Sequence, residues 1–385
     1  MSAPVIERQL PDEDAEALLA LTRELADREL RANADQAEAT GEFPRNLFRV
    51  IGRAGLLGLP FPLSHGGGGQ PYEVYLQVVE ELARSWLTIG LGVSVHTLAA
   101  HALATVGTPE QQKRWLPDIV GGELLGAYCL SEPHSGSDAA ALRTRASVQP
   151  DGSYRITGTK AWITHGGQAD FYFVLARTDE HPTRGITGFL VDAATAGISI
   201  APPERKMGMK ASVTTQVSFD DVPVEADRRL GSEGEGFRLA MAALDAGRLG
   251  IAAGAVGVAQ AALDVALRYA RERTSFGSPI GEHQGVSFLL ADAASGIEAA
   301  RALYLSAARR KDAGRPYSTQ AAMAKLIATD MCMRVTTDMV QVLGGAGYVA
   351  DYPVERYMRE AKALQIVEGT NQIQRLVIGR TLLRG

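Results

Sequence analysis

DFYFVLAR (170–177), GITGFLVD (185–192) and TTQVSFDDVPV (214–224) are the stretches of this 385-residue sequence that decide its fold. Each is a short run rich in β-branched and aromatic residues, and turn signals such as Asp151-Gly152 separate runs of this kind. They predict a small β domain from about residue 126 to residue 226. On both sides of it the apolar residues recur at helical spacing, which predicts helices before and after the sheet.

The region before the sheet contains one uncharged segment. Residues 86–108 carry no formal charge, and an uncharged run of this length raises the question of a membrane span. Its polar residues fall on one helical face, which predicts a buried helix facing a polar cavity. The alternative is a core helix whose hydroxyls bond back to their own turns. The stripe consists of Ser94, Thr97, His101 and Thr105.

The region after the sheet is divided by Pro279, Pro316 and Pro353 into four segments of roughly 25 to 40 residues. Four long helices with short connections predict an up-down bundle. The fold class is therefore mainly α with a central β domain. We expect an N-terminal all-helical domain over residues 1–125, a middle β domain over 126–232 and a C-terminal four-helix bundle over 233–385.

Composition excludes several classes of protein. The 39 basic and 44 acidic residues leave a net charge of −5, so we expect neither nucleic acid nor a membrane surface as a partner. The two cysteines, Cys129 and Cys332, form no disulfide framework, and the closest histidines, His96 and His101, are not spaced as zinc ligands on one helix face. We therefore expect no metal site. The acidic N-terminus has no apolar core of a signal peptide, which predicts a cytoplasmic protein.

Three segments carry residues suited to chemistry, although each has an ordinary structural interpretation. The backbone N–H groups and serines of YCLSEPHSGSD (128–138) could hold an anion. KAWITHGG (160–167) places Trp162 and Thr164 on one face of an extended segment, where a flat cofactor could stack, but a Trp beside a Thr is common in any β core. No Gly-x-Gly-x-x-Gly follows a strand, so a dinucleotide would not bind in the Rossmann manner.

The third segment is LQIVEGTNQIQRLVIGR (364–380), in which Glu368 stands directly before a glycine and a new helix start. Asn371 and Gln374 have the spacing of a capping box, which places Glu368 at a junction between helices. In the apolar context of Ile366 and Val367, desolvation would raise the pKa of Glu368 and make it a useful base near neutral pH. A capping or surface acid is the alternative.

Taken together and in order, the segments resemble the acyl-CoA dehydrogenases over about residues 12 to 382. Besides the three segments above, the matching stretches are FDDVPV (219–224), LDAGR (244–248), RERTSFGSPIGEHQ (271–284), QVLGGAGY (341–348) and YPVERYMREAK (352–362). The resemblance implies an FAD-dependent enzyme, with the cofactor between the β domain and the bundle.

The resemblance also implies a role for individual residues. Glu368 matches the catalytic base. The positions that match substrate contacts are Ser137, Asp245, Arg248 and Gly369. The positions that match contacts to FAD in the same subunit are Tyr128, Leu130, Ser131, Gly136, Ser137, Trp162, Thr164, Thr370 and Gln372. The positions that match contacts from a neighbouring subunit are Arg273, Phe276, Gln341 and Gly345, which implies a homotetramer built as a dimer of dimers.

The implied reaction is α,β-dehydrogenation of an acyl-CoA to a trans-2-enoyl-CoA. Glu368 would take the α-proton, FAD would accept the β-hydride, and electron-transferring flavoprotein would reoxidise it. Members that act on isovaleryl substrates carry their base near the position of Arg248, and Gly247 leaves none there. His165 and Val367 depart from the residues frequent in the family, Asn and Tyr, which leaves chain length open.

The alternatives in the same fold are an acyl-CoA oxidase or flavin monooxygenase and a dehydrogenase of carrier-protein-bound acyl groups. A non-catalytic helical interaction protein would need a degenerate flavin site. Ser137, Trp162, Thr164 and Arg273 are all present, which argues against that class.

Overall fold

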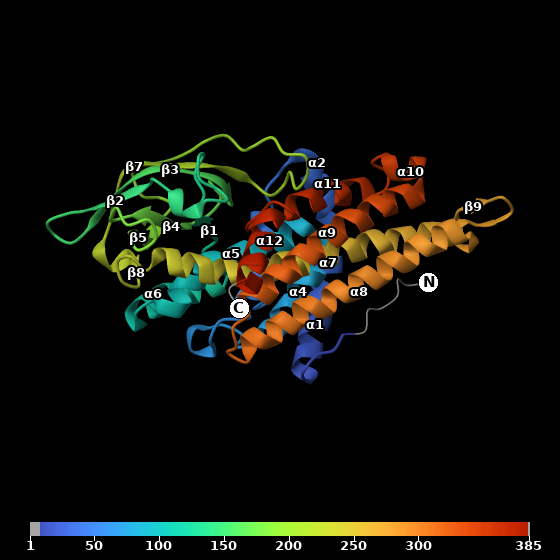
Figure 1. Cartoon of the computed structure of the whole chain (residues 1–385), viewed down its shortest axis with the longest axis horizontal. Coiled ribbons are helices and arrows are strands. Elements are labelled where there is room, and N and C mark those ends of the chain that lie inside the picture. The colour runs from blue at the N-terminus through green and yellow to red at the C-terminus, as the bar shows by residue number, and fades with distance from the viewer. Residues whose placement is uncertain (1–7, 384–385) are drawn as a thin grey trace.

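The computed structural model describes residues 8–383, and its order of helices, sheet and helices confirms the predicted fold class (Figure 1). Residues 1–7 and 384–385 lie outside the described residues. They include part of the N-terminus on which the expected absence of a signal peptide rests, and the outer ends of the predicted first and third domains.

The helices before the sheet form the N-terminal part of the molecule. A π-helical turn, Ala26–Leu30, joins the first two helices, and Thr108 caps the last one in a capping box with Gln111, as the Thr108-Pro109 pair leads one to expect. The bounds are α1 Glu13–Leu25, α2 Arg31–Thr40, α3 Arg45–Arg53, α4 Tyr72–Ser85, α5 Leu87–Val106 and α6 Pro109–Val120.

The sheet has the order β6-β7-β3-β2-β4-β5-β8, with β1 pairing parallel to β4. Most other pairs are antiparallel, and the register of β3 against β7 shifts between Lys160 and Ile163, where a bulge interrupts the ladder. The bounds are β1 Gly126–Cys129, β2 Arg145–Val148, β3 Tyr154–Thr164, β4 Phe171–Arg177, β5 Ile186–Asp192, β6 Ile198–Ile200, β7 Thr214–Val224 and β8 Arg229–Leu230.

The C-terminal part is a helical bundle that differs from the prediction in its fourth segment. Three long helices are present as expected, but the fourth segment consists of two shorter ones, α11 and α12, that both pack against α9. A two-stranded hairpin, β9 (Thr274–Ser275) and β10 (Ser278–Pro279), joins the first two long helices. The bounds are α7 Gly236–Glu272, α8 Gln284–Asp312, α9 Ser318–Leu343, α10 Gly345–Tyr348, α11 Val354–Leu364 and α12 Asn371–Leu383.

Two helices, α5 and α7, are long and apolar enough to cross a membrane, and both are mostly buried in the interior. Their apolar character is therefore accounted for by packing inside the fold. The second interpretation of the polar stripe on α5, hydroxyls that bond back to their own helix, applies to part of it. Thr97 accepts a hydrogen bond from Tyr75 on α4 (3.1 Å), whereas Thr105 donates to the carbonyl of His101 in its own helix (2.8 Å).

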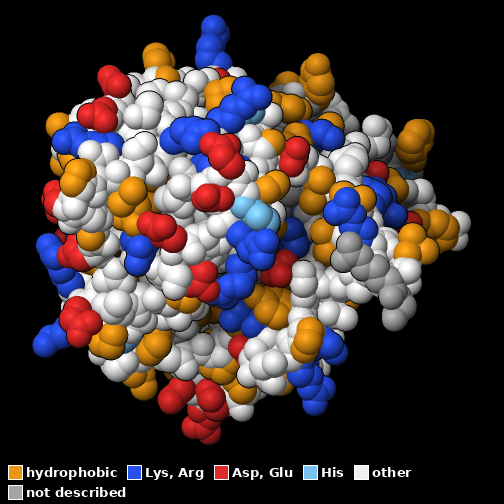
Figure 2. Space-filling model, turned by 60° about the vertical axis from the view of Figure 1, so that its left-hand side comes forward, with side chains coloured by type: hydrophobic (Ala, Val, Ile, Leu, Met, Phe, Trp, Pro, Cys, Tyr) orange, Lys and Arg blue, Asp and Glu red, His pale blue; other side chains and the backbone are white. Residues whose placement is uncertain are grey.

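The sheet and the β9–β10 hairpin lie at opposite ends of the molecule (Figure 1). In Figure 1, α7 runs from the sheet at one end to the β9–β10 hairpin at the other, and α10 lies near that hairpin. On the face in Figure 2, acidic and basic side chains are interspersed with uncharged surface, so this face presents no extended field of one sign.

Candidate active site

Glu368 lies in the short connection between α11 and α12, with its backbone in the left-handed region (φ 52°) and Gly369 following at φ 90°. The side chain of Thr370 caps α12 by accepting a hydrogen bond from the N–H of Ile373 (3.3 Å). The predicted capping box of Asn371 and Gln374 is wrong, because Thr370 takes the capping position and Gln374 donates instead to the carbonyl of Gly369 (2.7 Å). The junction itself is where the sequence predicted it.

The carboxylate of Glu368 points into the interior. Both of its oxygens are buried, and neither has a hydrogen-bond partner among the described residues. Burial raises the pKa of Glu368 to about 7, although the positive charges of Lys325 and Arg248 oppose the rise. One wall is the backbone of α7 at Gly247, where an added Cβ would lie only 3.0 Å from Cδ of Glu368. A buried carboxylate without a partner is costly in a core, and it is expected where a ligand completes the site.

Arg248 follows Gly247 on α7 and is only 5% exposed. Its Nη1 donates to Asp245 (2.6 Å), and its Nε is buried without a partner. Burial raises the pKa of Asp245, and the guanidinium of Arg248 opposes that rise. The unused donor on Arg248 and the unused acceptors on Glu368 therefore face the same interior region, one from α7 and the other from the connection between α11 and α12.

Tyrosines from α4 and β1 complete the wall around the carboxylate. Tyr72 donates to the carbonyl of Ala246 (3.0 Å), and Tyr75 donates to Thr97. Burial raises the pKa of Tyr72, Tyr75 and Tyr128, and the negative charge of Glu368 adds to the rise at each of them. These three phenols consequently stay protonated and act as neutral walls.

The edge of the sheet presents the second group of predicted residues. Trp162 sits at the β3 bulge with φ 63° and is 63% exposed, and Thr164 is two residues further along the same strand. The N–H of Ala161 donates to the carbonyl of Ser131 (2.9 Å), which holds the loop 130–138 beside this edge. An added Cβ at Gly136 would meet nothing within 4 Å, so the loop is open there.

A buried ion pair, which the sequence analysis did not single out, anchors the loop to β3. Lys160 is fully buried, and its Nζ donates to Glu132 (2.9 Å) and to the carbonyl of Leu130 (3.0 Å). The Glu132 carboxylate also accepts from the N–H groups of Arg143 (2.7 Å) and Thr144 (2.9 Å). This pair fixes the loop's conformation relative to β3.

Comparisons with known proteins decide the family. The acyl-CoA dehydrogenase N-terminal, middle and C-terminal domain models match residues 12–123, 127–222 and 234–383. This chain belongs to the acyl-CoA dehydrogenase family. An acyl-CoA dehydrogenase of Bacillus subtilis is 44% identical over 367 residues, covering 95% of this chain and 97% of that protein. A short-chain specific acyl-CoA dehydrogenase of Clostridium acetobutylicum is 41% identical over 373 residues, covering 96% and 98%.

Solved structures agree with this assignment. Butyryl-CoA dehydrogenase from Megasphaera elsdenii superposes with a TM-score of 0.96 at 40% identity, covering 98% of this chain and 100% of that one. A chain from a structure described as the electron transferring flavoprotein of Acidaminococcus fermentans gives 0.96 at 41% identity, covering 99% and 100%. A glutaryl-CoA dehydrogenase from Mycobacterium smegmatis in complex with FADH2 gives 0.92 at 29% identity, covering 97% and 95%. This chain is therefore an acyl-CoA dehydrogenase oxidoreductase.

Within this acyl-CoA dehydrogenase, the predicted residues fall into three groups in space, one of which is the group around Trp162 described above. Glu368, Gly369, Asp245, Arg248 and Tyr128 surround one interior region. The residues assigned to a neighbouring subunit are at the opposite end of the bundle from the sheet, on or beside the β9–β10 hairpin and α10 (Figure 1). These are Arg273, Phe276, Gln341 and Gly345, of which Phe276 is 98% exposed. Their contribution to a second subunit stays a prediction.

The two departures from the family pattern contact the protein core. His165 packs edge-on against Phe48, and its Nδ1 lies 3.0 Å from the carbonyl of Gly126. Burial lowers the pKa of His165 to about 4, so the ring is neutral at physiological pH. Val367 is partly buried against the main core. His165 therefore contacts the backbone at the start of β1.

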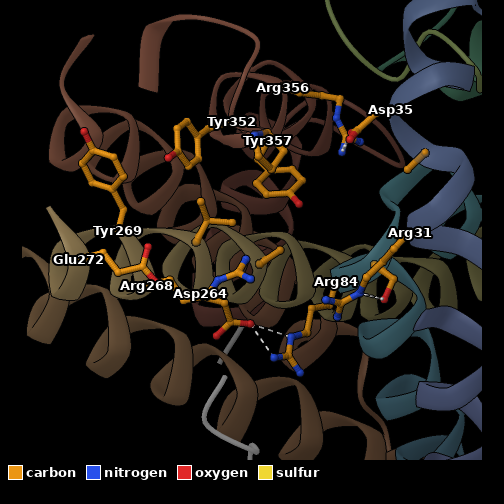
Figure 3. A pocket seen from close by; sticks show the side chains of 15 residues that line it. Arg31, Asp35, Arg84, Asp264, Arg268, Tyr269, Glu272, Tyr352, Arg356 and Tyr357 are labelled. Atoms are coloured by element: carbon orange, nitrogen blue, oxygen red, sulfur yellow. Dashed lines mark hydrogen bonds and ion pairs between the residues drawn. The ribbon is translucent and has the colours of Figure 1, made fainter. Parts of the chain in front are cut away.

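A second cavity, of about 490 Å³, lies apart from Glu368 between α2, α4, α7 and α11 (Figure 3). Its charged side chains are largely paired with one another. Arg84 donates to Asp264 (2.6 and 2.9 Å), and Arg356 donates to Asp35 (3.0 Å). Arg268 and Glu272 also line the cavity.

Sequence reasoning missed Lys325, whose Nζ donates to the carbonyl of Gly369 (3.0 Å), as well as Tyr72 and Tyr75. Lys325 is a single cation on the apolar face of α9. A lone charged residue on a face of alanines is a signal of a buried functional contact, and it was available in the sequence.

Proposed function

We propose that this chain is an FAD-dependent dehydrogenase of short, uncharged acyl-CoA thioesters, in which Glu368 abstracts the α-proton. The observation that carries the proposal is the Glu368 carboxylate, which is buried, has no partner and has its pKa raised by burial to about 7. A general base works best with a pKa near the operating pH, and an isolated buried carboxylate with these properties has no structural task.

The residues at the sheet edge fit FAD. Trp162 offers an exposed aromatic face, the loop at Gly136 is open, and the Glu132–Lys160 pair holds that loop in place. Trp162 and Thr164 would flank the flavin ring, and Ser131, Gly136 and Ser137 would lie along the rest of the cofactor. When bound, FAD supplies a two-electron acceptor for the hydride from the substrate β-carbon.

The chain's own groups would polarise and orient the thioester. The N–H of Glu368 donates to no acceptor among the described residues, so it can bind the developing oxyanion on the thioester carbonyl. Asp245 and Arg248 would contact the CoA arm. The tyrosine walls exclude water, which keeps the carboxylate basic and the reaction away from solvent.

The acyl end of the substrate is proposed from the composition of α5. Between Leu87 and Val106 this helix has no Asp, Glu, Lys or Arg, so it offers no cation to a terminal carboxylate. An uncharged acyl group fits such a wall. The short-chain specific and butyryl-CoA relatives support a short chain.

Three further features belong to the same proposal. Electron-transferring flavoprotein would reoxidise the cofactor, and the similarity to a chain in the Acidaminococcus fermentans structure supports it. A homotetramer would bring Arg273 and Phe276 to a neighbouring FAD. A cytoplasmic location is also part of the proposal.

Anaerobic titration of the FAD-loaded protein tests the proposal. Butyryl-CoA should bleach the flavin absorbance, glutaryl-CoA should not, and longer or branched saturated acyl-CoAs define the chain length accepted. The variant Glu368→Gln, with flavin still bound, is the matched control and should stay coloured. If no saturated acyl-CoA bleaches the wild type, the proposal is wrong, and bleaching by glutaryl-CoA alone would overturn the uncharged-acyl part. Repeating the experiment in air separates a dehydrogenase from an oxidase.

A further inference from the structure

Lys325 lies on α9 and is fully buried. Its Nζ donates to the carbonyl of Gly369 (3.0 Å) and to Oδ1 of Asn371 (2.7 Å). The first acceptor belongs to the connection that carries Glu368, and the second is the first residue of α12. A buried ammonium therefore contacts the backbone one residue after the base.

The junction needs such support because its backbone is strained. A left-handed conformation at a residue other than glycine costs on the order of 1 kcal/mol and persists only where the surroundings determine it. The Gly369 carbonyl accepts from two side chains, Lys325 and Gln374 (2.7 Å). Asn371 is in turn fixed by Thr329, which lies one turn after Lys325 on α9 (2.9 Å).

Besides its hydrogen bonds to the junction, Lys325 acts on Glu368 through its positive charge. The cations facing Glu368 are Lys325 from α9 and Arg248 from α7, and both lower its pKa against the effect of burial. Burial lowers the pKa of Lys325 to about 7, while Glu368 and the two acceptors favour its charged form. The other titratable groups around the pair are Asp245 on α7, Asp330 on α9, Tyr72 and Tyr75 on α4, and Tyr128 on β1.

We propose that Lys325 is a positioning residue for the base: its ammonium holds the Gly369 carbonyl and Asn371, and so aims the Glu368 carboxylate at the substrate while facing it with a positive charge. This inference rests on the proposed function of Glu368. It assigns a task to a buried cation whose hydrogen bonds go to residues that directly follow the base.

The test is the pH profile of flavin reduction by butyryl-CoA under anaerobic conditions. We expect Lys325→Gln, which keeps a donor and removes the charge, to move the midpoint of the profile upward by about 1 pH unit, the lower end of the effect of a nearby opposite charge. Lys325→Met should show the same shift and a lower plateau rate, because it also removes one of the two donors to the Gly369 carbonyl and the donor to Asn371. Lys325→Arg should keep the midpoint near that of wild type.

Thr336→Val is the control on the same helix, because the Thr336 hydroxyl bonds only to carbonyls of its own helix (2.8 and 3.2 Å). It should leave the midpoint and FAD retention on dialysis unchanged. An unchanged midpoint in Lys325→Gln would overturn the inference even if the plateau rate falls, since a merely structural lysine would change only stability. If Lys325→Met does not fold, the Gln and Arg variants decide. Glu368→Gln separates the two failures: if it reduces flavin normally, the proposed function itself is wrong.

Discussion

Replacing Gly247 by alanine tests how closely the α7 backbone confines the Glu368 carboxylate. The added Cβ would lie 3.0 Å from Cδ of Glu368 and closer still to Oε2, whereas ordinary contacts of a Cβ begin near 3.4 Å, so the carboxyl group must shift by roughly 1 Å. A misplacement of about 1 Å costs a catalytic group on the order of 100-fold in rate. We therefore expect Gly247→Ala to lower the rate of flavin reduction by butyryl-CoA about 100-fold.

The change in stability of Gly247→Ala should be small although the change in rate is large, so measuring both distinguishes a displaced carboxylate from a destabilised protein. Alanine in a helix interior is more stable than glycine by roughly 0.5–1 kcal/mol, and this gain offsets part of the strain at Glu368. Anaerobic stopped-flow absorbance gives the rate, and thermal unfolding gives the stability. Gly254→Ala is the control on the same helix, because its Cβ would lie 3.6 Å from Leu87, an ordinary contact. Equal rates for Gly247→Ala and Gly254→Ala would refute the reasoning.

Three other perturbations give separate expectations. Glu368→Gln should reduce flavin at least about 10²-fold more slowly. Because burial raises the pKa of Glu368 to about 7, the wild type loses stability as pH rises from the ordinary carboxyl range to that value. Above pH 7 the free energy of unfolding of the variant should therefore exceed that of the wild type by up to about 3 kcal/mol, seen as a higher unfolding temperature, and the difference should disappear below pH 4. Arg273→Ala should release FAD on dialysis through loss of a pyrophosphate partner, whereas Arg271→Ala, two residues earlier, should not; equal retention would contradict a role at the cofactor. Lys160→Met should lower the free energy of unfolding by about 3–5 kcal/mol, measured by urea denaturation, because it leaves Glu132 buried without its cation, and a wild-type midpoint would show that the pair is not needed.

The order of domains could be predicted from the sequence because the periods differ. The residues of β7 alternate between more and less buried positions, whereas α1 buries Ala15, Leu19, Thr22 and Leu25 at intervals of three and four residues, and that difference is visible locally. The junction at Glu368 was also local, since a glutamate next to Gly369 stands between two helical patterns. The details of the cap were not, because Thr370, Asn371 and Gln374 all suit a helix start and their three-dimensional partners decide which one caps it.

The rest of the site depends on contacts between residues far apart in the sequence. Lys325 reaches Gly369 from 44 residues away, and Tyr72 reaches Ala246 across 174 residues. No local pattern encodes such a distance. What the sequence did contain was a cation on an alanine face of α9, and its buried position required a partner.

Two buried glutamates show how the fold separates structural charge from chemical charge. Glu80 on α4 is paired with Arg8 (2.8 Å) and Arg301 (2.8 Å) and accepts from Tyr304 (2.5 Å); burial alone would raise its pKa, but the two arginines lower it to about 2. Glu80 therefore stabilises the protein above the ordinary carboxyl pKa, and this contribution is lost as pH falls toward 2. Glu368 is equally enclosed, but its cations stand back from its oxygens, so its pKa moves the other way. Among residues 8–383, two guanidinium groups lie within 3 Å of Glu80, and none lies within hydrogen-bond reach of Glu368. The fold therefore keeps the Glu368 carboxylate without a partner at a cost in stability, which is what the proposed role of the substrate as its partner requires.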